Sequence, residues 1–160
     1  MLVGKYFRNI NKKNRSHYFS GLSLNSKSVK KKNIFFAIKG TNINGNKHIK
    51  EAIKKGATTI VSDLNFRGKK NSVLYINSNN SRKLLSGLAS QIYKNKLQNL
   101  VAVTGTNGKS SITDFYYQIL KLNKKKSALI GTLGIRTNSN KIPVQNTTLN
   151  PTALCKQLER

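Results

Sequence analysis

The sequence has a single cysteine, Cys155, so it cannot form an internal disulfide. This scarcity fits a protein that works in a reducing compartment. The first ten residues contain no apolar run long enough for a signal peptide. No stretch of the chain approaches the ~20 apolar residues that a membrane-spanning helix requires. We therefore expect a cytoplasmic protein without a membrane span.

Acidic residues are also scarce, because four Asp and Glu stand against 30 Lys and Arg and give a formal net charge of +26. This charge favours an anionic partner, which could be a nucleic acid, a membrane surface or a small substrate. Compositional bias is an alternative explanation, since Lys, Asn and Ile are the residues that AT-rich codons supply. The lysines are scattered along the sequence, without an Arg-rich stripe or an RNA-binding aromatic signature. We therefore expect an anionic ligand and no specific nucleic-acid partner.

The first part of the chain alternates short apolar runs with segments of helical spacing. The runs predict strands at residues 33–39, 57–62 and 72–76. The helical spacing predicts helices at residues 48–55 and 80–93. Aromatic residues are expected to anchor the basic segment before them, namely Tyr6, Phe7, Tyr18 and Phe19. This alternation predicts an α/β fold.

A polar stretch at residues 94–99 marks a change of unit. We place a small N-terminal α/β domain at residues 1–96 and the beginning of a second domain, built on a parallel sheet, at 97–160. The second part is predicted to hold a buried strand at 100–103, a helix at 112–122, a strand at 127–130 and a helix from Thr152. A parallel sheet is normally covered by helices on both faces, which takes more strands and helices than residues 97–160 provide. We therefore expect a truncated domain, either an N-terminal piece of a longer protein or a truncated product.

Between the predicted strand at 100–103 and the following helix lies Thr-Gly-Thr-Asn-Gly-Lys-Ser-Ser, residues 104–111. Glycines let backbone N–H groups turn toward a phosphate, and a helix N-terminus adds positive potential. Lys109 could then reach the β- and γ-phosphates of ATP, and the Ser110 hydroxyl could bind Mg²⁺. The general pattern G-x-x-x-x-G-K-[ST] has glycine where this chain has Val103. The segment predicts a phosphate-binding loop, with a plain strand-to-helix turn as the alternative.

The loop resembles that of the Mur ligase family, whose form T-G-T-N-G-K-T-T also lacks the first glycine. Residues 22–40 resemble the family block D-S-R-x-V-x-x-G-D-L-F-x-A-x-x-G. Residues 131–134, with 146–148 and Pro151, resemble the G-T-x-G and N-T-T-P of the member that adds the third residue of the peptidoglycan peptide. The resemblance runs from about Leu22 to the end of the sequence.

This resemblance implies an ATP-dependent amide ligase with two substrates, a UDP-N-acetylmuramoyl-peptide and an amino acid. Residues 1–96 would be its UDP-substrate-binding domain, and residues 97–160 the incomplete beginning of its ATP-binding domain with a parallel sheet. ATP would phosphorylate a substrate carboxylate to an acyl phosphate, and an amine would displace the phosphate. The residues expected to bind ATP are Gly105, Thr106, Asn107, Gly108, Lys109, Ser110 and Ser111, with Ser110 as the Mg²⁺ ligand. Those expected to bind the UDP-substrate are Leu24, Ser26, Thr41, Asn42, Ile43, Asn146, Thr147 and Thr148.

The chain also departs from the family pattern. Asn25 and Lys27 replace the Asp and Arg of the uridine-site block, and lysine lacks the planar fork of arginine. Two residues separate Thr148 from Pro151. The family's metal-binding Glu and His, its modified lysine and the domain that grips the amino acid would lie beyond Arg160. We therefore expect no catalytic residue in this chain, which would be a monomer that does not complete the ligation alone.

Two alternatives stay open. The chain could be another Mur-type ligase, of the dipeptide-adding or folylpolyglutamate kind, or a basic nucleic-acid-binding module with an incidental loop. Salt-dependent binding to any duplex would favour the module. Two further expectations concern single residues: Asp114 should lie on the exposed side of its helix, and Cys155 in a core or boundary position.

Overall fold

The computed structural model describes residues 1–40, 43–94, 98–143 and 149–159. The chain divides into two compact units, Met1–Lys94 and Asn95–Arg160. The predicted domain boundary after residue 96 stays a prediction, because residues 95–97 lie outside the described ranges. No helix within those ranges is long and apolar enough to cross a membrane.

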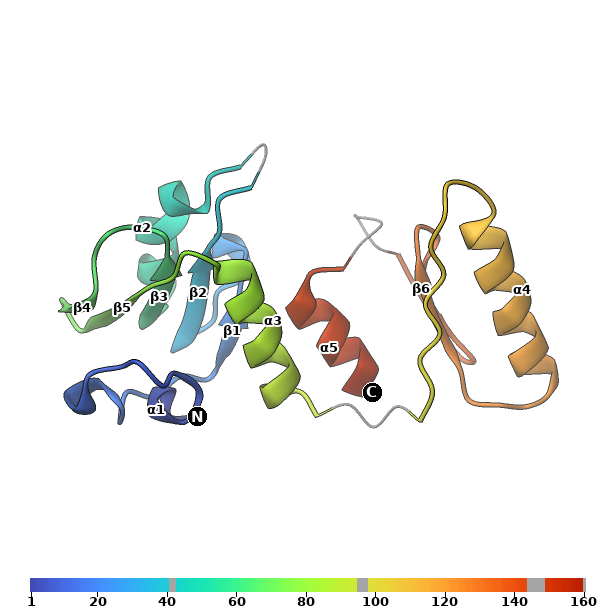
Figure 1. Ribbon diagram of the computed structural model, residues 1–160, viewed down its shortest axis with the longest axis horizontal. Helices are drawn as coiled ribbons and strands as arrows, with labels where there is room; N and C mark the ends of the chain where they lie inside the picture. Colours follow the sequence, from blue (N-terminus) through green and yellow to red (C-terminus); the bar gives the residue numbers. More distant parts are fainter. Residues whose placement is uncertain (41–42, 95–97, 144–148, 160) are drawn as a thin grey trace. The chain divides into compact units, whose positions relative to one another are not determined.

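The first unit is built on a five-stranded sheet with the order β1-β2-β3-β5-β4 (Figure 1). Its strands are β1 (Gly21–Ser23), β2 (Asn33–Ala37), β3 (Thr59–Ser62), β4 (Gly68–Lys70) and β5 (Val73–Asn77). Strands β1, β2, β3 and β5 are parallel, whereas β4 pairs antiparallel with β5. The predicted α/β class is confirmed for this unit, and β2, β3 and β5 are the three predicted strands. The short strands β1 and β4 were not predicted, since three residues carry too little periodicity.

Helices cover both sides of this sheet. They are α1 (Val3–Tyr6), α2 (Ile49–Lys54) and α3 (Ser81–Ile92), joined by the 3₁₀ turns η1 (Lys12–Asn14), η2 (Ser26–Ser28) and η3 (Gly45–His48). Helices α2 and α3 both contact β2 and lie on its two sides (Figure 1). All five residues of β2 are buried, as expected of a parallel strand with both faces covered.

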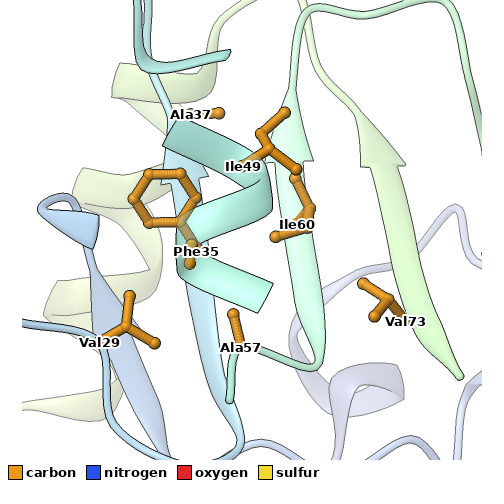
Figure 2. Close-up of a cluster of buried hydrophobic side chains, with 8 residues drawn as sticks. Val29, Phe35, Ala37, Ile49, Ala57, Ile60 and Val73 are labelled. Carbon is orange, nitrogen blue, oxygen red and sulfur yellow. The ribbon is translucent and has the colours of Figure 1, made fainter. Parts of the chain in front are cut away.

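One hydrophobic cluster fills the space between α2 and the sheet. Figure 2 shows Phe35 and Ile60 pointing from their strands toward Ile49 of the helix. Ala52 and Ala57 complete this layer, and both are almost fully buried. Because small residues stand where the helix and its following turn approach the strands, α2 can pack closely against β2 and β3.

The basic N-terminal segment is anchored by fewer aromatic residues than predicted. Phe7 and Phe19 are buried, and the rings of Tyr6 and Phe19 meet edge to face with centroids 5.6 Å apart. The prediction for Tyr18 is wrong, because its side chain is 50% exposed. Tyr18 lies beside Leu2 in an isolated antiparallel bridge, whose alternation turns Phe19 inward and Tyr18 outward.

The second unit contains α4 (Lys109–Leu122), β6 (Ala128–Gly131), β7 (Gly134–Thr137), β8 (Lys141–Ile142) and α5 (Pro151–Glu159). The three strands form an antiparallel sheet in sequence order. Gly134 is required at its turn, since its φ is +104° and an added Cβ would lie 2.6 Å from the Ile142 carbonyl oxygen. The predicted helices at 112–122 and from Thr152 correspond to α4 and α5, and Cys155 is buried on α5 as expected.

Two predictions for this unit are wrong. Residues 100–103 form no strand, and Leu100 and Val101 are 73% and 57% exposed. The parallel sheet expected for 97–160 is also not found among the described residues, where the strand predicted at 127–130 forms a hairpin instead. The physical reason is the same for both, because an apolar run becomes a strand only beside a partner strand, and none of the described strands pairs with 100–103.

Asp114 also lies elsewhere than predicted. Its carboxylate forms an ion pair with the guanidinium of Arg136 on β7, and both side chains are about one quarter exposed. The same guanidinium lies over the ring of the buried Tyr117, 5.4 Å from its centroid. Arg136 therefore joins α4 to the hairpin through one charge pair and one cation–π contact, and Asp114 faces the hairpin rather than solvent.

Candidate functional sites

The carboxyl ends of the parallel strands in the first unit meet at one edge of the sheet. Leu24 follows β1, Ile38 follows β2, Asp63 follows β3 and Ser78 follows β5. In parallel α/β sheets, ligands bind outside this edge, where loops and helix N-termini converge. We call it the carboxyl edge, and two of the predicted UDP-substrate residues, Leu24 and Ser26, lie in the segment that follows β1.

A hairpin-like loop rises from the carboxyl edge after β2. Lys39 and Asn44 form an isolated antiparallel bridge, and the Gly45 N–H donates to the Ile38 carbonyl over 3.0 Å. A Cβ on Gly45 would lie only 2.6 Å from the Ile38 nitrogen, so this close return of the chain requires glycine. Ile43 lies on this loop and is 66% exposed.

A cavity of about 170 Å³ opens at the same edge. Its lining comes from the ends of three parallel strands and the start of α3: Ala37, Ile38, Lys39, Asp63, Ser78, Asn79, Asn80, Ser81 and Arg82. The cationic side chains of Lys39 and Arg82 and the N-terminus of α3 all favour an anion. The volume suits a phosphate group or one ring, since sites for whole drug-sized ligands begin at about 300 Å³.

Sequence reasoning missed Lys39, Asp63 and Arg82. Lys39 is the last residue of a predicted strand, Asp63 directly follows one, and Arg82 lies at the start of a predicted helix, so the position of the carboxyl edge was a usable signal. Asp63 accepts a hydrogen bond of 2.7 Å from the Asn46 side-chain amide. An amide donor leaves the carboxylate its negative charge, so the lining holds two cationic side chains against one anionic side chain.

Ser26 is already engaged within the unit. Its side chain is 6% exposed, and its hydroxyl donates to Glu51 Oε2 over 2.7 Å. Asn25 stabilises the same turn by accepting from the Lys27 N–H over 2.9 Å, a capping role that asparagine performs as well as aspartate. The Ser26 hydroxyl can therefore accept a hydrogen bond from a ligand, but its proton is committed to Glu51.

Replacing Ser26 by alanine is expected to raise the pKa of Glu51 toward its ordinary value of 4.5. That pKa is lowered mainly by the Ser26 hydrogen bond, with smaller contributions from Lys55 and His48. Because the folded pKa is lowered, the stability that the bond contributes is present above the ordinary pKa and lost as pH falls through the lowered one. An NMR titration of the Glu51 carboxyl carbon measures the shift.

The matched control for this measurement is Ser28→Ala. The Ser28 hydroxyl donates to the Asn25 carbonyl and contacts the Ser23 hydroxyl, with no contact to Glu51. An unchanged Glu51 pKa in Ser26→Ala, or an equal rise in both variants, would contradict the assigned cause.

Five predicted substrate residues lie outside the described residues, namely Thr41, Asn42, Asn146, Thr147 and Thr148. Their contacts with a substrate stay predictions.

The second candidate site is the predicted phosphate-binding loop, which leads directly into α4. Gly105 and Gly108 have φ values of +151° and +77°, a region that glycine adopts without strain. The Lys109 ammonium folds back over the loop and donates to the carbonyls of Gly105 and Thr106, at 2.5 and 3.0 Å. All residues from Thr104 to Ser111 are exposed, so the loop is open to a ligand.

The loop has the features that a polyphosphate group needs. An added Cβ at Gly105 or Gly108 would meet no atom closer than 3.8 Å, which leaves room for phosphate oxygens against the backbone. The first N–H groups of α4 have no carbonyl of a preceding turn to bind and carry the positive end of the helix dipole. This geometry fits a polyphosphate, and ATP binding by residues 105–111 stays a prediction.

A metal ion at this loop would need most of its ligands from the nucleotide and from water. No group of three His, Cys, Asp or Glu side chains that could hold a metal occurs within the described part of the chain. Ser110 offers one hydroxyl at the start of α4. Mg²⁺ commonly takes phosphate oxygens and water besides one or two protein ligands, so this set fits a metal that arrives with the nucleotide.

Each of the two units matches a model of a known protein family. The family model described as "Mur ligase family, catalytic domain" matches residues 18–93, and the one described as "Mur ligase middle domain" matches residues 103–160. Together they match both compact units and both candidate sites.

Individual relatives agree with these matches. The UDP-N-acetylmuramoyl-L-alanyl-D-glutamate–2,6-diaminopimelate ligase of Rickettsia prowazekii (strain Madrid E) is 40% identical over 127 residues, which cover 79% of this chain and 26% of that protein. The chain thus spans about a quarter of the length of this relative.

Two solved structures are also similar. A structure of UDP-N-acetylmuramoyl-L-alanyl-D-glutamate–2,6-diaminopimelate ligase matches 99% of this chain and 33% of its own, with a TM-score of 0.78 and 23% identity. That identity supports the fold alone. The MurF ligase from Thermotoga maritima in complex with ADP matches 66% of this chain and 24% of its own, with a TM-score of 0.52 and 33% identity.

Proposed function

The chain belongs to the Mur ligase family, and from this we propose that it supplies the UDP-substrate-binding and ATP-binding parts of a ligase that adds the third amino acid of the peptidoglycan peptide. The substrate would be UDP-N-acetylmuramoyl-L-alanyl-D-glutamate, and the added amino acid 2,6-diaminopimelate, as in the name of the Rickettsia relative. The observation that carries the ATP-dependent part of the proposal is the glycine loop at the start of α4 with the Lys109 ammonium folded over it. The choice of the third amino acid rests on the 40% identity to the Rickettsia relative.

The two candidate sites suit the two parts of this reaction. Lys39, Arg82 and the N-terminus of α3 offer positive charge for the diphosphate of the UDP-substrate. Residues 105–111 offer backbone N–H groups and Lys109 for ATP. Phosphoryl transfer from ATP would convert the substrate carboxylate to an acyl phosphate, which the amine of the amino acid then attacks. Catalysis of such a step depends mainly on positioning and charge neutralisation.

The second candidate function is that of the dipeptide-adding ligase. The 33% identity to the MurF structure favours it. The two readings share the ATP loop and differ in the peptide that the UDP-substrate carries, so a binding experiment with both UDP-substrates separates them.

Titrating the isotope-labelled chain with UDP-N-acetylmuramoyl-L-alanyl-D-glutamate is expected to shift the amide signals of the carboxyl edge. The affected residues should include Leu24, Ile43, Asp63 and Arg82, because they border the proposed diphosphate and uridine positions. Signals from the opposite edge of the sheet, such as Lys31 and Lys70, should stay unchanged. Heteronuclear NMR spectra recorded along the titration give the measurement.

The control ligand is the UDP-substrate with a tripeptide, which is the acceptor for dipeptide addition. Tighter binding of the dipeptide form supports the proposed third-residue ligase, and tighter binding of the tripeptide form favours the second candidate. A spectrum that does not change with either ligand would refute the assignment of the carboxyl edge.

A further inference from the structure

The lysines that are scattered along the sequence gather at the amino edge of the first unit's sheet, opposite the proposed ligand edge. Four segments lead into the parallel strands β1, β2, β3 and β5. They carry Arg15, Lys30, Lys31, Lys32, Lys54, Lys55, Lys69 and Lys70, all of which are exposed. Because the strands are parallel, these segments meet along one edge.

Hydrogen bonds join these segments to one another. The Ser20 N–H donates to the Lys32 carbonyl over 2.9 Å, and the Lys32 N–H donates to the Gly56 carbonyl over 2.7 Å. The His17 ring lies 3.0 Å from the Thr58 carbonyl, which also accepts from the Leu74 N–H. Lys70 pairs with Val73, the first residue of β5. The cationic side chains are therefore displayed from one continuous surface, which we call the amino-edge surface.

Acidic side chains oppose little of this charge. Among the described residues of this surface, only Lys55 pairs with an acidic side chain, since its ammonium lies 3.9 Å from Glu51 Oε1. The first unit has two acidic residues, Glu51 and Asp63. Glu51 lies in the first turn of α2 and accepts from Ser26, and Asp63 follows the carboxyl end of β3. The pKa of His17 is lowered, chiefly by burial and in part by the charge of Lys69. A surface with eight cations and a single acidic neighbour lowers its electrostatic energy when it binds a polyanion.

Lys32 differs from the other lysines of this surface in its contact with an aromatic ring and in its backbone conformation. Its φ is +65°, a left-handed conformation that costs energy for a residue with a Cβ. The family block D-S-R-x-V-x-x-G-D-L-F quoted above has glycine at this place. Here the Lys32 ammonium lies 5.5 Å from the centroid of the half-exposed Tyr18 ring. Sites for single-stranded nucleic acid combine basic side chains along the backbone with exposed aromatic rings that stack on bases.

We propose that the amino-edge surface binds single-stranded nucleic acid, with its lysines on the phosphates and the Tyr18 ring stacked on a base. This binding is independent of the base sequence, since the surface offers charge and one aromatic face. It leaves the carboxyl edge free, so it does not compete with the UDP-substrate and does not depend on the function proposed above.

The test compares two variants that each lose four positive charges and each place one glycine at a left-handed position. The amino-edge variant is Lys31→Gln, Lys32→Gly, Lys69→Gln and Lys70→Gln. The control variant is Lys121→Gln, Lys124→Gly, Lys125→Gln and Lys126→Gln, in which Lys124 has a φ of +56°. All eight lysines are exposed, and circular dichroism checks that both variants fold.

Binding of a fluorescein-labelled oligonucleotide of about 20 bases is measured by anisotropy between roughly 50 and 200 mM KCl. The amino-edge variant should bind at least about tenfold more weakly, and the slope of log affinity against log salt should shrink by about three, at roughly 0.7 per lost phosphate contact. The control variant should keep most of the affinity and slope. Tyr18→Ala should weaken binding about tenfold without changing the slope.

Three results would overturn the proposal. Equal losses in both four-lysine variants would mean that only the net charge of the chain attracts the oligonucleotide. Duplex binding as tight as single-strand binding, unaffected by Tyr18→Ala, would remove the stacking role. Tighter binding to vesicles of phosphatidylcholine and phosphatidylglycerol, lost in the amino-edge variant, would assign the surface to a membrane instead.

Discussion

Replacing Lys109 by alanine is expected to weaken ATP binding by the full chain about ten- to hundredfold. A hydrogen bond to a charged group contributes about 1.5–3 kcal/mol, and Lys109 is the cation that folds over the loop. In the variant the carbonyls of Gly105 and Thr106 lose their ammonium partner, and the phosphates lose their counter-charge. Calorimetric titration with ATP and Mg²⁺ gives the two dissociation constants.

Lys121→Ala is the matched control, because it removes the same side chain from the last turn of the same helix. It is expected to leave ATP affinity within about twofold, since exposed charges more than a Debye length of ~10 Å from the ligand are largely screened. Equal affinity of Lys109→Ala and the unchanged chain would refute the phosphate-loop assignment and favour the plain strand-to-helix turn. That result would leave the UDP-substrate titration unaffected, so the two sites are tested separately.

Replacing Phe35 by alanine is expected to destabilise the first unit by about 3–5 kcal/mol. Phe35 is 1% exposed and points from β2 into the cluster under α2 (Figure 2). Its removal leaves a cavity between Ile49 and Ile60, which the sheet and the helix cannot fully close. Hydrogen exchange of the β3 amides, residues 59–62, reports the free energy of opening for this unit alone.

Phe115→Ala serves as the comparison, since Phe115 is 63% exposed on α4. Its replacement should change stability by no more than about 0.5 kcal/mol. If Phe35→Ala lowers the free energy of unfolding by less than about 1 kcal/mol, the packing in Figure 2 is contradicted. Replacing a buried phenylalanine by alanine typically costs about 3–5 kcal/mol.

The sequence predicted the first unit well because its periodicities are strong and the elements that cover one another are close in the chain. The apolar run at β2 and the helical spacing of α3 each indicate one structure. The three-residue strand β4 is too short to show such a periodicity, and only its antiparallel pairing with β5 identifies it. Lys39 and Arg82 stand far apart in the sequence, and the order of the strands brings them to one cavity.

The second unit was predicted less well, for a different reason. Leu100 and Val101 have the composition of a buried strand, but no described strand pairs with them. Strand formation depends on a partner that local sequence does not reveal. Asp114 was misplaced because an acidic residue on a helix is usually solvated, and the partner that draws it inward, Arg136, lies 22 positions later on β7.

The two outermost strands of the first unit's sheet, β1 and β4, also affect whether the molecule aggregates at high concentration. One border strand, β1, has only three residues, and the other, β4, ends in Lys69 and Lys70. An exposed border can recruit the border of a second molecule and seed aggregates, and short strands and lysines are the features that oppose this. The same lysines that build the amino-edge surface therefore act as gatekeepers against intermolecular strand pairing, and neutralising Lys69 and Lys70 removes a safeguard along with a binding surface.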